Sequence, residues 1–200
     1  TAAGPAFLQP ITLNGGTLMS GNTDANNYLG SPISLLAGST LDADSGDDLL
    51  LTNVISGPAG FTKAGTGALV LYASNTYAGV TVVSNGPSSQ TSAALWLLNY
   101  GALGTNQIQL RNPAAMTALY FPAAMGSGTL LNPIELNNAT NNITRITTDE
   151  ANTFIATLSA VVSGGHVTSE LLFDNDSGAA DAGRTRLANP GNTFVASRLR

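Results

Sequence analysis

The sequence has no cysteine and very little charge. Charged residues make up 10% of its 200 residues, well below the ~25% of an ordinary soluble domain. Without cysteine, the fold cannot use disulfides or thiolate metal sites. Lys63 is the only lysine and glutamate occurs three times, which excludes a coiled coil or a charged helical bundle. Seven basic residues at a pI near 4.5 exclude a nucleic-acid partner.

Long apolar runs are also missing. No stretch approaches the roughly 18 apolar residues of a membrane-spanning helix. The 22 glycines do not recur at every third position, which excludes collagen. A hydrophobic content of 43% with a net charge of −5 excludes a disordered chain. Because the chain begins at Thr1 without a recognisable leader, we expect that a leader was removed or that this is a segment of a longer protein.

Small residues replace the missing charge: Ser, Thr, Asn, Gly and Ala make up 109 of the 200 residues. Apolar and polar residues alternate in short runs that end at turn signals such as Asn14-Gly15-Gly16. Short, numerous strands without helical periodicity indicate an all-β protein. The predicted strands are residues 11–13, 33–35, 68–71, 80–83, 108–110, 134–136, 143–146 and 154–156.

Four sequence blocks occur twice, in the same order. The blocks that begin at residues 11, 32, 55 and 75 return at residues 108, 133, 162 and 192, with an offset that grows along the chain. The growing offset predicts insertions in the second copy, the largest near residues 174–181. We expect a single domain over residues 1–200 with nearly two copies of a unit of ~100 residues, about 1–100 and 101–200.

Residues 55–83 carry the most specific motif. Ile55-Ser56-Gly57 is followed by Phe61-Thr62-Lys63-Ala64, an alternating leucine strand and Asn75-Thr76-Tyr77. This order resembles the autotransporter-associated β-strand repeat. In the second copy the motif is degraded, since His166-Val167-Thr168-Ser169 replaces the Phe-Thr-Lys-Ala segment. The resemblance rests on Ile55, Gly57, Phe61, Lys63, Gly65, Leu69, Leu71, Asn75, Tyr77 and Gly79.

The resemblance implies a right-handed parallel β-helix in an exported protein, at a bacterial surface or secreted. At about 20–25 residues per turn, the chain would form roughly eight to ten turns. Stacked turns account for the composition, because small residues suit tight corners while Asn and Thr form hydrogen-bonded ladders. The resemblance also implies that Lys63 is a strand residue of the repeat consensus, and we expect it to be an exposed charge that prevents mispairing. A β-sandwich is the alternative fold.

Carboxylates cluster in one turn-like segment. Asp42, Asp44, Asp47 and Asp48 are weak candidates for calcium, because the cluster contains glycine but lacks the ligand pattern of an EF-hand. A solvated turn between strands is the simpler interpretation. The second Asp-rich segment, with Asp174, Asp176 and Asp181, lies out of the repeat register and predicts a surface loop.

Catalysis is not expected. His166, the only histidine, stands in a Gly-Gly-His segment without further ligands or a nucleophile motif, and we interpret it as an exposed turn residue. A polysaccharide lyase, the least favoured function, would need a basic proton acceptor, and Lys63 is the only lysine. We therefore predict no catalytic residues, no cofactor and no firm metal site.

Four aromatic residues could form a sugar-stacking platform: Trp96, Tyr100, Tyr120 and Phe121. Trp96 lies in an Ala-Leu-Trp-Leu-Leu segment that reads as a buried strand. We therefore favour packing in the core for this side chain.

The basic residues gather at one end. Arg184, Arg186, Arg198 and Arg200 lie within the last 17 residues, whereas the first hundred residues are acidic. We expect these arginines to serve head-to-tail self-association, since an uncapped β-helix can add to another. The predicted function is structural, as an extracellular or cell-surface filament subunit or stalk segment. Its partners would be copies of itself or adjoining repeats of a longer chain; the alternative is an adhesin for glycans or host protein.

Overall fold

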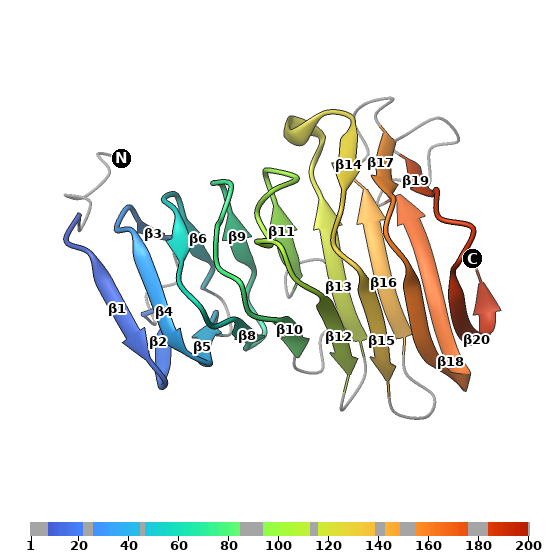
Figure 1. Ribbon diagram of the computed structural model, residues 1–200, viewed down its shortest axis with the longest axis horizontal. Helices are drawn as coiled ribbons and strands as arrows, with labels where there is room; N and C mark the ends of the chain where they lie inside the picture. The colour runs from blue at the N-terminus through green and yellow to red at the C-terminus, as the bar shows by residue number, and fades with distance from the viewer. Residues whose placement is uncertain are drawn as a thin grey trace.

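The chain forms a parallel β-solenoid whose strands stack along one long axis (Figure 1). The computed structural model describes residues 8–21, 26–44, 47–84, 94–112, 116–138, 143–148, 155–175 and 184–199. Every strand pair within these ranges is parallel. The all-β prediction is confirmed, and the β-sandwich alternative is wrong. These ranges contain no α-helix. Within them, the structure has no helix whose length and apolar character would let it cross a membrane.

Two long ladders form the first and second faces of the solenoid. The first face contains β2 (Thr17–Met19), β5 (Ser39–Asp42), β8 (Phe61–Ala64), β10 (Thr81–Ser84), β12 (Ile108–Asn112) and β15 (Ile134–Asn138). The second face contains β3 (Asn27–Leu29), β6 (Leu49–Leu51), β9 (Leu69–Leu71), β11 (Leu95–Leu97), β13 (Met116–Phe121) and β16 (Ile143–Thr148). Both ladders end on the long strand β18 (Val162–Asn175), which also pairs with β20 (Thr193–Leu199).

Two shorter ladders complete the turns. One joins β1 (Ile11–Asn14), β4 (Ile33–Ala37) and β7 (Ile55–Ser56) near the N-terminus. The other joins β14 (Gly128–Leu130), β17 (Ile155–Leu158) and β19 (Arg184–Leu187) near the C-terminus. A 3₁₀ turn, η2 (Ala123–Met125), precedes β14.

The turns lengthen along the chain. Ile11 pairs with Ile33 and Ile33 with Ile55, in steps of 22 residues. Farther along, Ile134 pairs with Val162, a step of 28 residues. The prediction of eight to ten turns is therefore too high, because it assumed short turns throughout. The right-handed sense of winding stays a prediction.

The core forms because successive turns place apolar side chains above one another. On the second face, Leu49, Leu69 and Leu95 stack in register and are buried. On the first face, Val83, Leu110 and Leu136 do the same. Period-two alternation sends these side chains inward and their neighbours outward, so each turn adds one layer to a continuous core.

Asparagines join neighbouring turns at the corners. Asn75 Oδ1 accepts a hydrogen bond from the Ile55 amide at 2.7 Å, and Nδ2 donates to the Ala102 carbonyl at 2.6 Å. Asn192 Oδ1 likewise accepts from the Val162 amide at 2.9 Å. These two bonds link residues that the sequence blocks equate. However, Ile55 lies in the ladder of β1, β4 and β7, whereas Val162 lies in that of β12 and β15. The two-copy organisation stays a prediction.

Candidate functional site

The motif residues 55–79 converge on the interior of one turn. Ile55, Phe61, Leu69, Leu71 and Tyr77 are buried in the main core. The Phe61 and Tyr77 rings meet edge to face with centroids 5.4 Å apart, and the Tyr77 hydroxyl hydrogen-bonds to the buried Thr81 hydroxyl at 2.5 Å. Burial raises the pKa of Tyr77, so this phenol remains neutral at physiological pH.

Three motif glycines lie where neighbouring backbones approach. Gly57 and Gly65 have positive φ angles, and a Cβ at either would overlap the carbonyl oxygen of the preceding turn. Gly79 lies against the Gly60 backbone with no room for a side chain. The motif residues thus serve packing and turn-to-turn contact.

Lys63 is buried, and the prediction of an exposed charge is wrong. It pairs with Leu41 on one side and Val83 on the other, so it occupies an inward position in an apolar column. Its side chain is 0% exposed. Alternation could have revealed this, because Lys63 is two residues from the inward Phe61 and must share its side of the strand.

The Lys63 ammonium stabilises the loop that follows its own strand. Nζ donates to the carbonyl oxygens of Ala64 at 3.0 Å, Gly65 at 2.8 Å and Gly67 at 2.7 Å. Three N–H donors therefore meet three carbonyl acceptors, which is what a buried ammonium requires. Burial lowers the pKa of Lys63 to about 7, while Asp42 and Asp48 oppose that shift.

The pKa of Lys63 predicts a rise in stability with pH. The pKa of Lys63 is about 7 in the folded chain and 10.5 in an exposed, unfolded chain, so between these pH values the unfolded chain binds more protons. The free energy of unfolding should therefore rise with a slope of up to about 1.4 kcal/mol per pH unit, and Lys63 contributes no slope below the folded pKa. Urea unfolding of wild type and Lys63→Met across this range measures the difference. Parallel pH profiles of the two proteins would contradict the prediction.

The four calcium candidates have different surroundings. Asp47 is buried and Asp44 is exposed, while Asp48 accepts a hydrogen bond from the Ala68 amide at 2.8 Å. Asp42 lies at the end of β5 next to Ala64. Across the part of the chain that the structure describes, no group of three or more His, Asp or Glu residues is placed to hold a metal ion. Calcium binding by this cluster stays a prediction.

Other predicted residues fall at the C-terminal end. His166 lies within β18 and pairs with Ala196, so its backbone is in a strand and not in a turn. Asp174 also lies in β18, whereas Asp176 and Asp181 lie outside the described residues. Arg184 and Arg186 lie on β19, Arg198 lies on β20 next to Glu170, and Arg200 lies outside the described residues.

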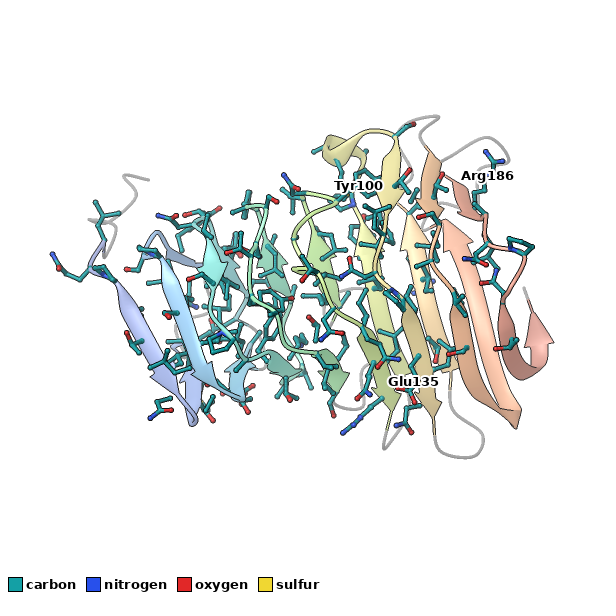
Figure 2. All side chains as sticks on the ribbon, in the orientation of Figure 1. Tyr100, Glu135 and Arg186 are labelled. Atoms are coloured by element: carbon teal, nitrogen blue, oxygen red, sulfur yellow. The ribbon has the colours of Figure 1, made fainter. Side chains whose placement is uncertain are left out.

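The four aromatic residues do not form one platform. Phe121 is buried in the main core, and Tyr100 stacks on it with ring centroids 6.1 Å apart. The Tyr100 hydroxyl donates to the Gly126 carbonyl at 2.9 Å, next to η2, where Figure 2 shows it. The Trp96 and Tyr120 side chains lie on the other side of the sheet, with ring centroids 4.3 Å apart. Trp96 is outside the main core, because Leu95 and Leu97 on either side point inward. The prediction of core packing is therefore wrong for the main core, but Trp96 is half-buried against a smaller apolar cluster, and Tyr120 is buried.

Comparison with known protein families connects this turn to a named repeat. Residues 61–86 match the passenger-associated-transport-repeat. The match begins at Phe61 and includes Lys63, Asn75 and Tyr77, so it covers the buried lysine, the corner asparagine and the aromatic pair. It confirms the suspected autotransporter-type repeat. No curated protein and no solved structure matches the chain.

Proposed function

We propose that this chain is a structural, non-enzymatic segment of an exported, passenger-type protein at or beyond the cell surface. The matched repeat and the parallel solenoid support this function. The motif side chains are used for packing and hydrogen bonds inside the turn, and Lys63 is buried where no polysaccharide could reach it. The motif side chains therefore build the interior of a shaft.

We further propose that copies of the shaft stack head to tail. The first described turn supports this proposal. Four apolar side chains of β1, β2 and β3 continue the core columns but are only half-buried, whereas their partners one turn later are buried. The half-buried residues and their partners are Ile11 with Ile33, Leu13 with Leu35, Leu18 with Leu41 and Leu29 with Leu51. An apolar layer of this kind stabilises best when another turn covers it.

Charge supplies the polarity of the proposed contact. Arg186 is exposed on β19, near the C-terminal end of the solenoid (Figure 2). Arg184 lies on the same strand and Arg198 on β20, the last strand of its ladder. Asp42, Asp44 and Asp48 lie in the second turn from the opposite end. A basic end meeting an acidic end favours a filament subunit or a stalk segment with one direction.

Self-association of the chain tests this proposal. Light scattering and electron microscopy should show mass that grows with concentration and rods longer than one chain. Leu18→Lys, in the half-buried layer, should abolish the growth, whereas Met19→Lys, which changes the exposed neighbour on β2, should retain it. Circular dichroism of both variants checks the fold. A folded wild-type chain that stays monomeric at all concentrations would overturn the stacking proposal.

An adhesin for glycans or host protein is the second candidate, and Tyr28 and Trp96 on the outside of the second face bear on it. They belong to one outward column that runs through Tyr28, Leu50, Val70, Trp96 and Tyr120. Tyr28 is 59% exposed and Trp96 is half-buried, whereas the three other side chains are buried. Aromatic rings with one face open to solvent suit stacking against a glycan. Trp96 is the only tryptophan, so a saturable change in its emission should report glycan binding, and a flat response across a broad panel would exclude it.

A further inference from the structure

Asn14 stands at an unusually open corner. It is the last residue of β1 and is exposed, and Gly15 and Gly16 follow it with φ angles of 83° and 86°. A Cβ built at either glycine would meet no atom within 4 Å. The backbone after Asn14 therefore has both conformational freedom and space.

The Asn14 side chain also differs from the other corner asparagines. Asn53 accepts a hydrogen bond from the Val54 amide at 2.7 Å and donates to the Gly30 carbonyl at 3.0 Å. Asn106 makes the same pair of contacts at 2.7 and 2.8 Å. Among the described residues, Asn14 has no such partner. Its carboxamide is free to rotate toward the following peptide unit.

We propose that Asn14 is a site of spontaneous chemical modification, in which its side-chain amide converts to a carboxylate through a cyclic imide. Hydroxide takes the proton of the Gly15 N–H, the resulting backbone nitrogen attacks Cγ of Asn14, the N–Cγ bond forms, and the Cγ–Nδ2 bond breaks. Nδ2 takes a proton from water and leaves as ammonia, which returns the hydroxide. A second water then opens the ring at either carbonyl, giving aspartate or iso-aspartate. The net change adds one water and releases one ammonia, with no change of oxidation state.

The product would alter the first turn in two ways. A carboxylate replaces a neutral amide at the end of β1, which makes an already acidic end more acidic. Iso-aspartate also lengthens the backbone by one carbon, at a point where the register with β4 is already irregular, since Leu13 pairs with Leu35 and Asn14 with Ala37. The modification would therefore loosen the end of β1 from β4. This inference does not depend on the proposed function.

Peptide mapping of the 200-residue chain tests the modification. Native wild type, aged at mildly alkaline pH, should lose the Asn14 amide and gain aspartate and iso-aspartate at that position, while Asn53 and Asn106 stay intact. The same measurement on the urea-unfolded chain gives the rate of Asn14 amide loss in the absence of folded structure. Asn14→Gln, aged in the same way, should gain no iso-aspartate at residue 14. If native Asn14 persists while the unfolded chain converts, the fold protects the site and the proposal is wrong; persistence in both states also overturns it.

Discussion

Replacement of Lys63 by methionine should destabilise the protein by about 3 kcal/mol. Methionine fills much of the same space but donates no hydrogen bonds, so the carbonyls of Ala64, Gly65 and Gly67 lose their shared donor. The Ala64 carbonyl keeps the hydrogen bond from the Ala43 amide at 3.2 Å, so the carbonyls of Gly65 and Gly67 are the acceptors left without this donor. Each unsatisfied buried acceptor costs about 1–3 kcal/mol, and relief of the buried charge offsets part of the sum. Urea unfolding at neutral pH measures the change.

Thr62→Ala is the matched control for Lys63. Thr62 is the neighbouring residue on β8, points to the other side of the strand and is only half-buried. Its truncation should change the free energy of unfolding by less than about 0.5 kcal/mol, as surface substitutions usually do. An exposed lysine would behave in the same way. Similar small effects for Lys63→Met and Thr62→Ala would therefore contradict the buried position and its three hydrogen bonds.

Gly60→Ala should destabilise the protein by about 3 kcal/mol or more, or prevent folding. A Cβ at Gly60 would overlap the carbonyl oxygen of Val80 and the backbone of Gly79 in the next turn. Backbone atoms of two hydrogen-bonded turns cannot yield as a flexible side chain can, so the stacking distance itself would have to change. Thermal unfolding followed by circular dichroism measures the loss.

Gly38→Ala provides the comparison one turn earlier. Gly38 precedes Ser39 as Gly60 precedes Phe61, and Ser39 pairs with Phe61, so the two glycines share one corner column. A Cβ at Gly38 meets nothing within 4 Å. Gly38→Ala should be neutral or slightly stabilising, because it restricts the unfolded chain at no steric cost. If Gly60→Ala and Gly38→Ala change the stability by equal amounts, the close approach of the Val80 backbone to Gly60 does not cause the destabilisation.

The sequence predicted strands better than it predicted turns. Alternation identified β1, β4, β9, β10, β12, β15, β16 and β17 to within two residues at each end. It missed β2 and β5 as separate elements, because corners such as Gly38 interrupt what reads as one irregular segment. The strand β8 was expected only from the resemblance to the repeat. Turn length was also missed, since corner loops of different size leave no signal in the strand pattern. The eight to ten predicted turns followed from that omission.

Orientation errors at Lys63 and Trp96 have a common origin. In each case residue type was weighted above position: charge suggested exposure for Lys63, and apolar neighbours suggested burial for Trp96. The strand pleat sends alternate side chains to opposite sides regardless of type. Because the Phe61 side chain points inward, the Lys63 side chain two residues later points inward as well. Because Leu95 and Leu97 point inward, Trp96 between them points outward. Three carbonyls brought together by the loop after β8 then make the buried lysine stable.

By itself, the sequence determined that this chain is all-β, built from short strands, and similar to an autotransporter-type repeat. Stacked turns explain the scarcity of charge, because like charges at equivalent positions of adjacent parallel strands would lie one strand spacing apart and repel each other. Only the tertiary structure decided what each side chain meets. Turn-to-turn register placed Lys63 between Leu41 and Val83, set Gly60 against Val80, and left the first-turn apolar column half-covered. These contacts join residues 20 or more positions apart, and no local pattern records which turn will lie above which.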